Sequence, residues 1–134
     1  MSVIDVKAVM VDIAAAVQTV LASGRTASPR PVEAAVAGDA IVGYPTGPIS
    51  IADTYGRGSD RLTLPLYIIL GLPADESTQT ALSTWVGSGS IVAAIESYAG
   101  TWQSVSVMEA SVETYTPIGG PEQLALRFDI DILS

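Results

Sequence analysis

The sequence predicts a single α+β domain with a mainly antiparallel sheet, an N-terminal helix and two short helices packed on one face of the sheet. Apolar residues recur every three or four positions near the start of the chain and again after its midpoint, as in amphipathic helices. Large apolar residues occupy every second position over 62–70 and 124–132, as in half-buried strands. This order of helix, strands, helices and strands is typical of α+β folds. The 134 residues suit one domain, 1–134.

The first element is expected to be an amphipathic helix that ends at Gly24, because glycine is common just after a helix C-terminus. Its apolar positions share one helical face: Val3, Val6, Met10, Ile13, Val17, Val20 and Leu21. The next segment, 24–39, contains two prolines and has no clean period. We expect an irregular loop or one short strand there.

A hairpin is expected over 49–70. Gly56 and Gly58 allow a tight reversal, and every second residue of the strand that follows, from Leu62 to Leu70, is apolar. Pro65 lies inside this strand and cannot donate a ladder hydrogen bond. It therefore indicates a sheet edge or a bulge at that point.

Two short helices are expected next, one after Leu72 and one over 91–98, separated by a break at 87–90. In the first helix Thr78, Ala81, Leu82, Trp85 and Val86 are expected to share a face. Two strands then complete the domain. The apolar phase of the first changes between Val107 and Met108, which predicts a β-bulge.

The amino-acid composition excludes several classes of function. Hydrophobic residues make up 49% and charged residues 15% of the chain, which suggests that some apolar surface is buried against other chains. The sequence has no cysteine and no histidine, which excludes disulfides, thiolate metal sites and imidazole general bases. We expect no enzyme activity, no catalytic residue, no metal and no cofactor.

The net charge and the hydropathy pattern of the chain indicate which partners and which cellular location to expect. The net charge of −8 opposes nucleic-acid binding, which needs clustered cations. No apolar run reaches the roughly 18 residues of a membrane span, so no membrane partner is expected. The segment 1–21 lacks a basic start, which argues against a secretory signal and favours use in a cytoplasm.

Two groups of residues are candidates for function. The first is the glycine-rich tip of the hairpin: Tyr55, Gly56, Arg57, Gly58, Asp60 and Arg61. A phosphate-binding loop would lead into a helix, whereas this one leads into a strand, so a hairpin turn with exposed or partner-facing charges is favoured. The second group consists of acids on the two final strands: Glu109, Glu113, Asp129 and Asp131. A metal or acid-base site is conceivable there, but alternating acids on a sheet face are mostly just solvated.

Several segments carry a resemblance to a known family. Tyr44-Pro45, YGRGSDRLTLPL (55–66), WVGSGSIVAAIES (85–97), IGG (118–120) and the final alternating strand follow one another in order. Over about 40–133 this arrangement resembles the tail terminator proteins of long-tailed (siphovirus-type) bacteriophages, especially those that infect actinobacteria. GRGSD and GSGSIVAAIE are the specific parts of the match.

The resemblance implies a structural virion protein at the head-tail junction, assembled in the host bacterial cytoplasm. Such a protein forms a hexameric ring on the completed tail tube, stops tube growth and offers a face to the head-completion (stopper) protein. Double-stranded DNA passes through the ring without specific binding. The alternatives are another ring protein of the junction or tube, such as a stopper or tube subunit, and more distantly a small-ligand-binding module.

Within such a ring each candidate group has a role. The charged tip 55–61 would contact a neighbouring subunit or tail ring, because opposite charges on a repeated tip can fix the register between identical copies. The four acids would line the hole and repel phosphate. The alternative is that these acids face outward and keep the ring soluble.

Overall fold

The structure is a computed structural model, and it describes residues 5–21, 24–29, 37–45, 61–72, 76–98, 100, 102, 104–115 and 122–133. The elements in chain order are α1 (Val6–Gln18), β1 (Ala27–Ser28), β2 (Ala40–Val42), β3 (Arg61–Gly71), α2 (Glu76–Ser88), α3 (Ser90–Ser97), β4 (Ser104–Tyr115) and β5 (Gln123–Leu133).

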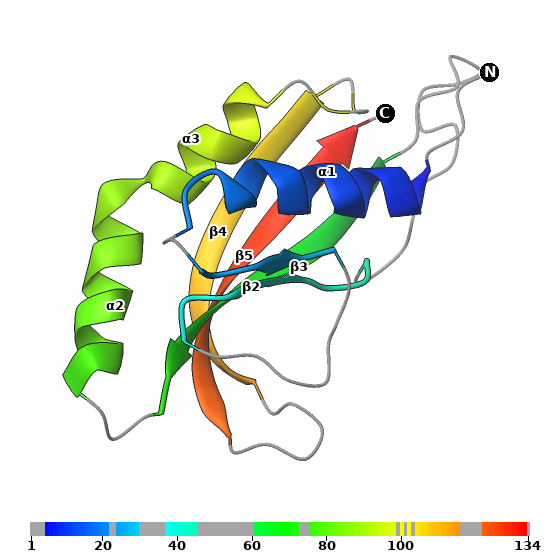
Figure 1. Cartoon of the computed structure of the whole chain (residues 1–134). Coiled ribbons are helices and arrows are strands. Elements are labelled where there is room, and N and C mark those ends of the chain that lie inside the picture. The colour runs from blue at the N-terminus through cyan, green and yellow to red at the C-terminus, as the bar shows by residue number, and fades with distance from the viewer. Residues whose placement is uncertain are drawn as a thin grey trace, which may run out of the picture.

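The described strands form one sheet in the order β1-β2-β3-β5-β4. Only β1 and β2 run parallel; the other neighbours are antiparallel. Figure 1 shows α1 lying across one face of this sheet, with α3 on the same side near β4 and α2 running down past the sheet margin. The predicted α+β fold with its helices on one face is confirmed.

The core lies between the helices and this face of the sheet. Its strand side chains are alternate residues of β3 and β5, as the sequence pattern predicts: Leu62, Leu64, Leu66, Ile68, Leu70, Leu126, Phe128, Ile130 and Ile132. Helix α1 packs Val9, Ile13 and Val17 against them. Burying each such aliphatic side chain contributes about 1.5–3 kcal/mol, so this layer fixes the orientation of the sheet.

Helix α1 is shorter than predicted. Asp5 caps its start by accepting a hydrogen bond from the Ala8 N–H at 3.1 Å. It ends at Gln18 and not at Gly24, with Thr19 as the C-cap. The physical reason is local, because the Thr19 hydroxyl donates to the Ala16 carbonyl and the Gln18 side chain bonds the next segment, so the turn closes without a glycine.

The segment after α1 contains the expected short strand, β1. Of the hairpin expected over 49–70, residues 49–60 lie outside the described residues, including Tyr55, Gly56, Arg57, Gly58 and Asp60. Strand β3 itself is present from Arg61, and it pairs with β2 on one side and β5 on the other.

Pro65 lies in β3, which is the central strand of the described sheet and not an edge strand, and no bulge occurs at it; only the end of β2 makes its position resemble an edge. The Pro65 carbonyl accepts a hydrogen bond from the Gly43 N–H at 2.8 Å, so the proline nitrogen also faces the β2 side of β3. Strand β2 has already ended at Val42. The missing proline N–H therefore interrupts no described ladder bond.

Helices α2 and α3 are separated by a single residue, Gly89, in the left-handed conformation (φ +65°). The predicted break at 87–90 is thus too long, since α2 continues through Ser88 and α3 starts at Ser90. Val86 was expected on the packed face but is 60% exposed. Ala81, Leu82 and Trp85, which were expected on the same face, do pack against the core.

Strands β4 and β5 pair along their whole length. The predicted bulge is confirmed, because the register shifts between Val107 and Glu109. Met108, the extra residue, is 64% exposed. The bulge restores the phase of β4 so that Glu109 lies directly opposite Asp129.

Candidate assembly surface on the open sheet face

The sheet face opposite the core is polar over β3, β5 and β4. Side chains alternate along a strand, so the residues between the core positions all point to this second face. We call it the open face. Its charged members are Arg61, Glu109, Glu113, Arg127, Asp129 and Asp131. The four acids named from the sequence therefore share one face.

Arg127 is the centre of this face. Its Nε donates to Asp129 Oδ1 at 2.9 Å, and its Nη1 donates to Glu113 Oε1 at 3.2 Å. The side chains of Arg127 and Asp129 are only 21% and 19% exposed. Burial is the largest single influence and lowers the pKa of Arg127, but the hydrogen bond with Asp129 and the nearby charges of Asp129 and Glu113 together outweigh it, so the pKa is raised. The guanidinium therefore stays charged and fixed.

Tyr67 lies on β3 directly opposite Arg127. Burial raises the pKa of its hydroxyl, and the charge of Arg127 opposes this only in part. Its ring packs against Tyr115 of β4, with ring centroids 5.9 Å apart. Both tyrosines border a small apolar cluster of Ile41, Ile69 and Ala125, so one end of the open face is apolar and the other is charged.

The other charged residues are more exposed. Arg61 Nε lies 3.8 Å from Asp131 Oδ2, and the Arg61 side chain is 51% exposed. Arg61 is the one described residue of the predicted tip, and it turns toward the open face of its own sheet. Glu109 is exposed and faces the carboxylate of Asp129 across the β4–β5 ladder. Like charges opposite each other disfavour pairing, and Arg127 offsets this through its bond to Asp129.

The arrangement suits a charged surface better than a reaction centre. Among the described residues, no three carboxylates converge as a metal site requires. Glu113, Asp129 and Asp131 each have an arginine partner. Arg127 was not singled out from the sequence, although it alternates in phase with Asp129 and Asp131 and that pattern could have revealed it.

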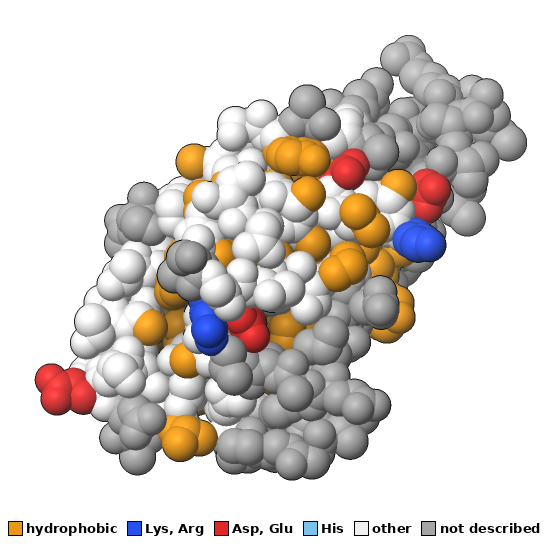
Figure 2. All heavy atoms as spheres, viewed as in Figure 1, with side chains coloured by type: hydrophobic (Ala, Val, Ile, Leu, Met, Phe, Trp, Pro, Cys, Tyr) orange, Lys and Arg blue, Asp and Glu red, His pale blue; other side chains and the backbone are white. Residues whose placement is uncertain are grey.

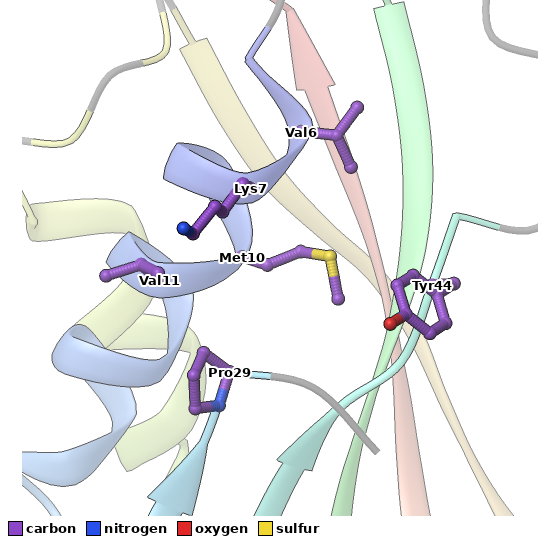
Figure 3. A pocket seen from close by; sticks show the side chains of 6 residues that line it. All are labelled: Val6, Lys7, Met10, Val11, Pro29 and Tyr44. Carbon is purple, nitrogen blue, oxygen red and sulfur yellow. The ribbon is translucent and has the colours of Figure 1, made fainter.

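A shallow pocket lies on the opposite side of the molecule, at the start of α1. Its volume is about 290 Å³, and its lining is mostly apolar: Val6, Lys7, Met10, Val11, Pro29 and Tyr44. Figure 3 shows the Met10 side chain extending from α1 between Pro29 and Tyr44. Figure 2 shows hydrophobic side chains gathered on this face of the molecule, and Val11 and Tyr44 are 44% and 62% exposed. No motif in the sequence predicts this pocket.

Comparisons with protein-family models and with curated proteins identified no relative of this chain. No protein-family model matches the chain, and a search of curated proteins finds no match. None of the helices in the described part of the chain is long and apolar enough to cross a membrane.

Proposed function

We propose that this chain is a structural subunit of a phage tail terminator ring. Six copies would close on the finished tail tube, stop its growth and present a joining surface to the head-completion protein. DNA would pass through the central hole. The resemblance over 40–133 suggests this role, and the open face of the sheet supports it.

The supporting observation is that the open face offers no free cation to DNA. Among the described residues of β3, β4 and β5, its two cations are Arg61 and Arg127, and carboxylates hold both. With four acids against these two arginines the face has a net charge of −2. Phosphate contacts to free Lys and Arg dominate DNA affinity. A wall of this kind would let DNA slide past.

Exposed apolar residues also support assembly. Val11, Tyr44, Leu72, Val86, Met108 and Val112 are each more than two-fifths exposed. They lie on helices α1 and α2, on strand β4 and just beyond the ends of β2 and β3. A subunit that contacts copies of itself, a tube and a head protein needs several such surfaces.

The same features suit a stopper or a tube subunit, so the decisive experiment is genetic. Removing the gene of a terminator should give particles with tails of variable, excessive length, whereas removing a tube subunit should give no tails. A stopper mutant should have tails of normal length that do not join filled heads. Normal particles without the gene would refute the proposal.

A ligand-binding module remains the second candidate, because the pocket of about 290 Å³ beside α1 has a mostly apolar lining that includes one lysine. Its size is at the lower end for small-molecule sites, which are about 300–1,000 Å³. Electron microscopy of the purified protein separates the two ideas. Rings with a central hole support the structural role, and monomers alone, with or without tubes, oppose it.

A further inference from the structure

The two edges of the described sheet differ in how they are protected. Strand β1 forms one edge and β4 the other. An edge strand presents unpaired N–H and C=O groups that can pair with another strand. Soluble proteins usually block such edges, so an unblocked edge indicates a partner.

The β1 edge is closed by one side chain. The Thr26 carbonyl accepts from the Ala40 N–H on β2, so the Arg25 carbonyl and the Ala27 N–H point away from the sheet. The Gln18 amide takes both, donating to the Arg25 carbonyl at 2.8 Å and accepting from the Ala27 N–H at 2.8 Å. An added strand would have to displace this amide.

Other parts of the chain cover the β4 edge only in its first half. Val105 and Val107 are half-buried against the core, and the Val107 N–H donates to the Glu96 carboxylate of α3 at 3.4 Å. From Met108 to Val112 every residue is exposed, whichever face it points to. This part contains no lysine or proline, and the features in it that commonly guard edges are the bulge at its first residue, Met108, and the charge of Glu109.

We infer that two copies of this chain join through an antiparallel pairing of their β4 strands, centred on Ala110. Gln18 closes the β1 edge. In the described part of two copies, the remaining way to pair two sheet edges is therefore β4 with β4. The contact is isologous, with the same residues on both sides. It does not depend on the ring proposed above.

Charge selects the register. A centre at Glu109 or Ser111 would place glutamates directly opposite each other, Glu109 against Glu109 or Glu113 of the partner subunit. A centre at Ala110 instead places Glu109 opposite Ser111 of the partner subunit. It also brings Met108, the bulge residue, near Val112 of the partner subunit, and both are exposed apolar residues.

The chain has no cysteine, so single-cysteine variants of the whole protein test this pairing cleanly. Cβ atoms directly opposite across strands lie about 4.5–5.5 Å apart, close enough for a disulfide after a small adjustment. Ala110→Cys should form a disulfide-linked dimer on mild oxidation. Thr114→Cys, exposed on the same strand, is the control: its two copies would lie about 27 Å apart along the strand and should stay unlinked. Equal linkage of both variants, or linkage of Thr114→Cys alone, would overturn the register.

Sedimentation velocity tests the edge without a disulfide. The wild-type protein should contain dimers. Val112→Lys should raise the Kd of the dimer tenfold or more, since a lysine on an edge strand opposes pairing with another strand. Val86→Lys makes the same change at an exposed residue of α2 and should leave the Kd unchanged. Circular dichroism checks that both variants are folded. A wild-type monomer at all concentrations, or equal effects of the two lysines, would refute the β4 contact.

Discussion

At the scale of single residues, Arg127 shows how a charged side chain becomes part of the structure. Its guanidinium holds two acids on the open face, and both it and Asp129 are about four-fifths buried. Replacing Arg127 by methionine keeps the apolar stem and leaves Asp129 and Glu113 without their cation. Exposed pairs contribute about 0–1 kcal/mol and breaking fully buried pairs costs about 3–5 kcal/mol, so we expect this largely but not fully buried pair to lose about 1–2 kcal/mol.

Urea unfolding measures this loss, and Arg61→Met is the matched control. Arg61 is 51% exposed and its nitrogen lies 3.8 Å from Asp131. Its removal should change the free energy of unfolding by less than about 0.5 kcal/mol. Equal losses in the two variants would show that the Arg127 network contributes no more than a surface ion pair.

Because of Tyr67, the free energy of unfolding should depend on pH in the alkaline range. Burial raises the pKa of its hydroxyl in the folded protein, above its ordinary value of about 10 in the unfolded chain. Below that pH both states are protonated and the stability is complete. As the pH rises further the unfolded chain loses this proton first, so the free energy of unfolding should fall until the folded protein also ionises.

Tyr67→Phe should therefore show a smaller fall in stability at alkaline pH than the wild-type protein. Chemical unfolding at a series of pH values from about 9 to 11 measures both slopes, and the difference isolates Tyr67 from the other tyrosines. Parallel slopes would show that the hydroxyl is as well hydrated in the folded state as in the unfolded one.

At the scale of elements, a glycine ends β3 where the chain turns toward α2. Gly71 has φ +127°, and a Cβ there would lie 2.7 Å from Thr78 Oγ1. Thr78 is buried and donates a 2.7 Å hydrogen bond to the Leu72 carbonyl, so it cannot easily move away. Gly71→Ala should cost roughly 2–3 kcal/mol, from backbone strain and this clash together.

Gly89→Ala is the control for the backbone contribution. Gly89 also has a positive φ, +65°, but a Cβ there would meet nothing within 4 Å. We expect roughly 1 kcal/mol from the left-handed conformation alone. Thermal or urea unfolding gives both values, and a loss at Gly71 no larger than at Gly89 would mean that Thr78 adapts at no cost.

The elements also show what the sequence could and could not predict. Alternation located β3 and β5, and the change of phase at Val107 located the bulge, because period and register are properties of neighbours along one chain. The predicted end of α1 at Gly24 and the predicted place of Val86 on the packed face of α2 were wrong. Both depend on contacts made after folding, the first on Gln18 reaching the β1 segment and the second on where the end of α2 lies relative to the core.

At the scale of the whole molecule, the same limit applies to the site. The acids could be placed on one face from alternation, but the arginine that holds two of them and the open edge of β4 arise from pairing between strands far apart in sequence. The ring and its orientation require other subunits. They remain predictions to be tested by assembly.

The last prediction concerns the wall of such a ring. If the open face lines the hole, a new cation there should slow passing DNA, because free lysines gain phosphate contacts. Asp131 is the suitable position, since its ion pair with Arg61 is long and partly exposed, and losing it should cost little stability. Asp129 is less suitable because Arg127 holds it at 2.9 Å.

Particles built with Asp131→Lys should therefore be complete but eject DNA slowly or incompletely, and the defect should ease as salt screens the new charge. Glu76→Lys makes the same change of charge on the exposed first turn of α2, away from the open face, and should eject DNA normally. The measurement is the rate of DNA release from purified particles at low and high salt. Normal release from Asp131→Lys particles would place the open face away from the hole, and slow release from both variants would trace the effect to net charge and not to a lumen.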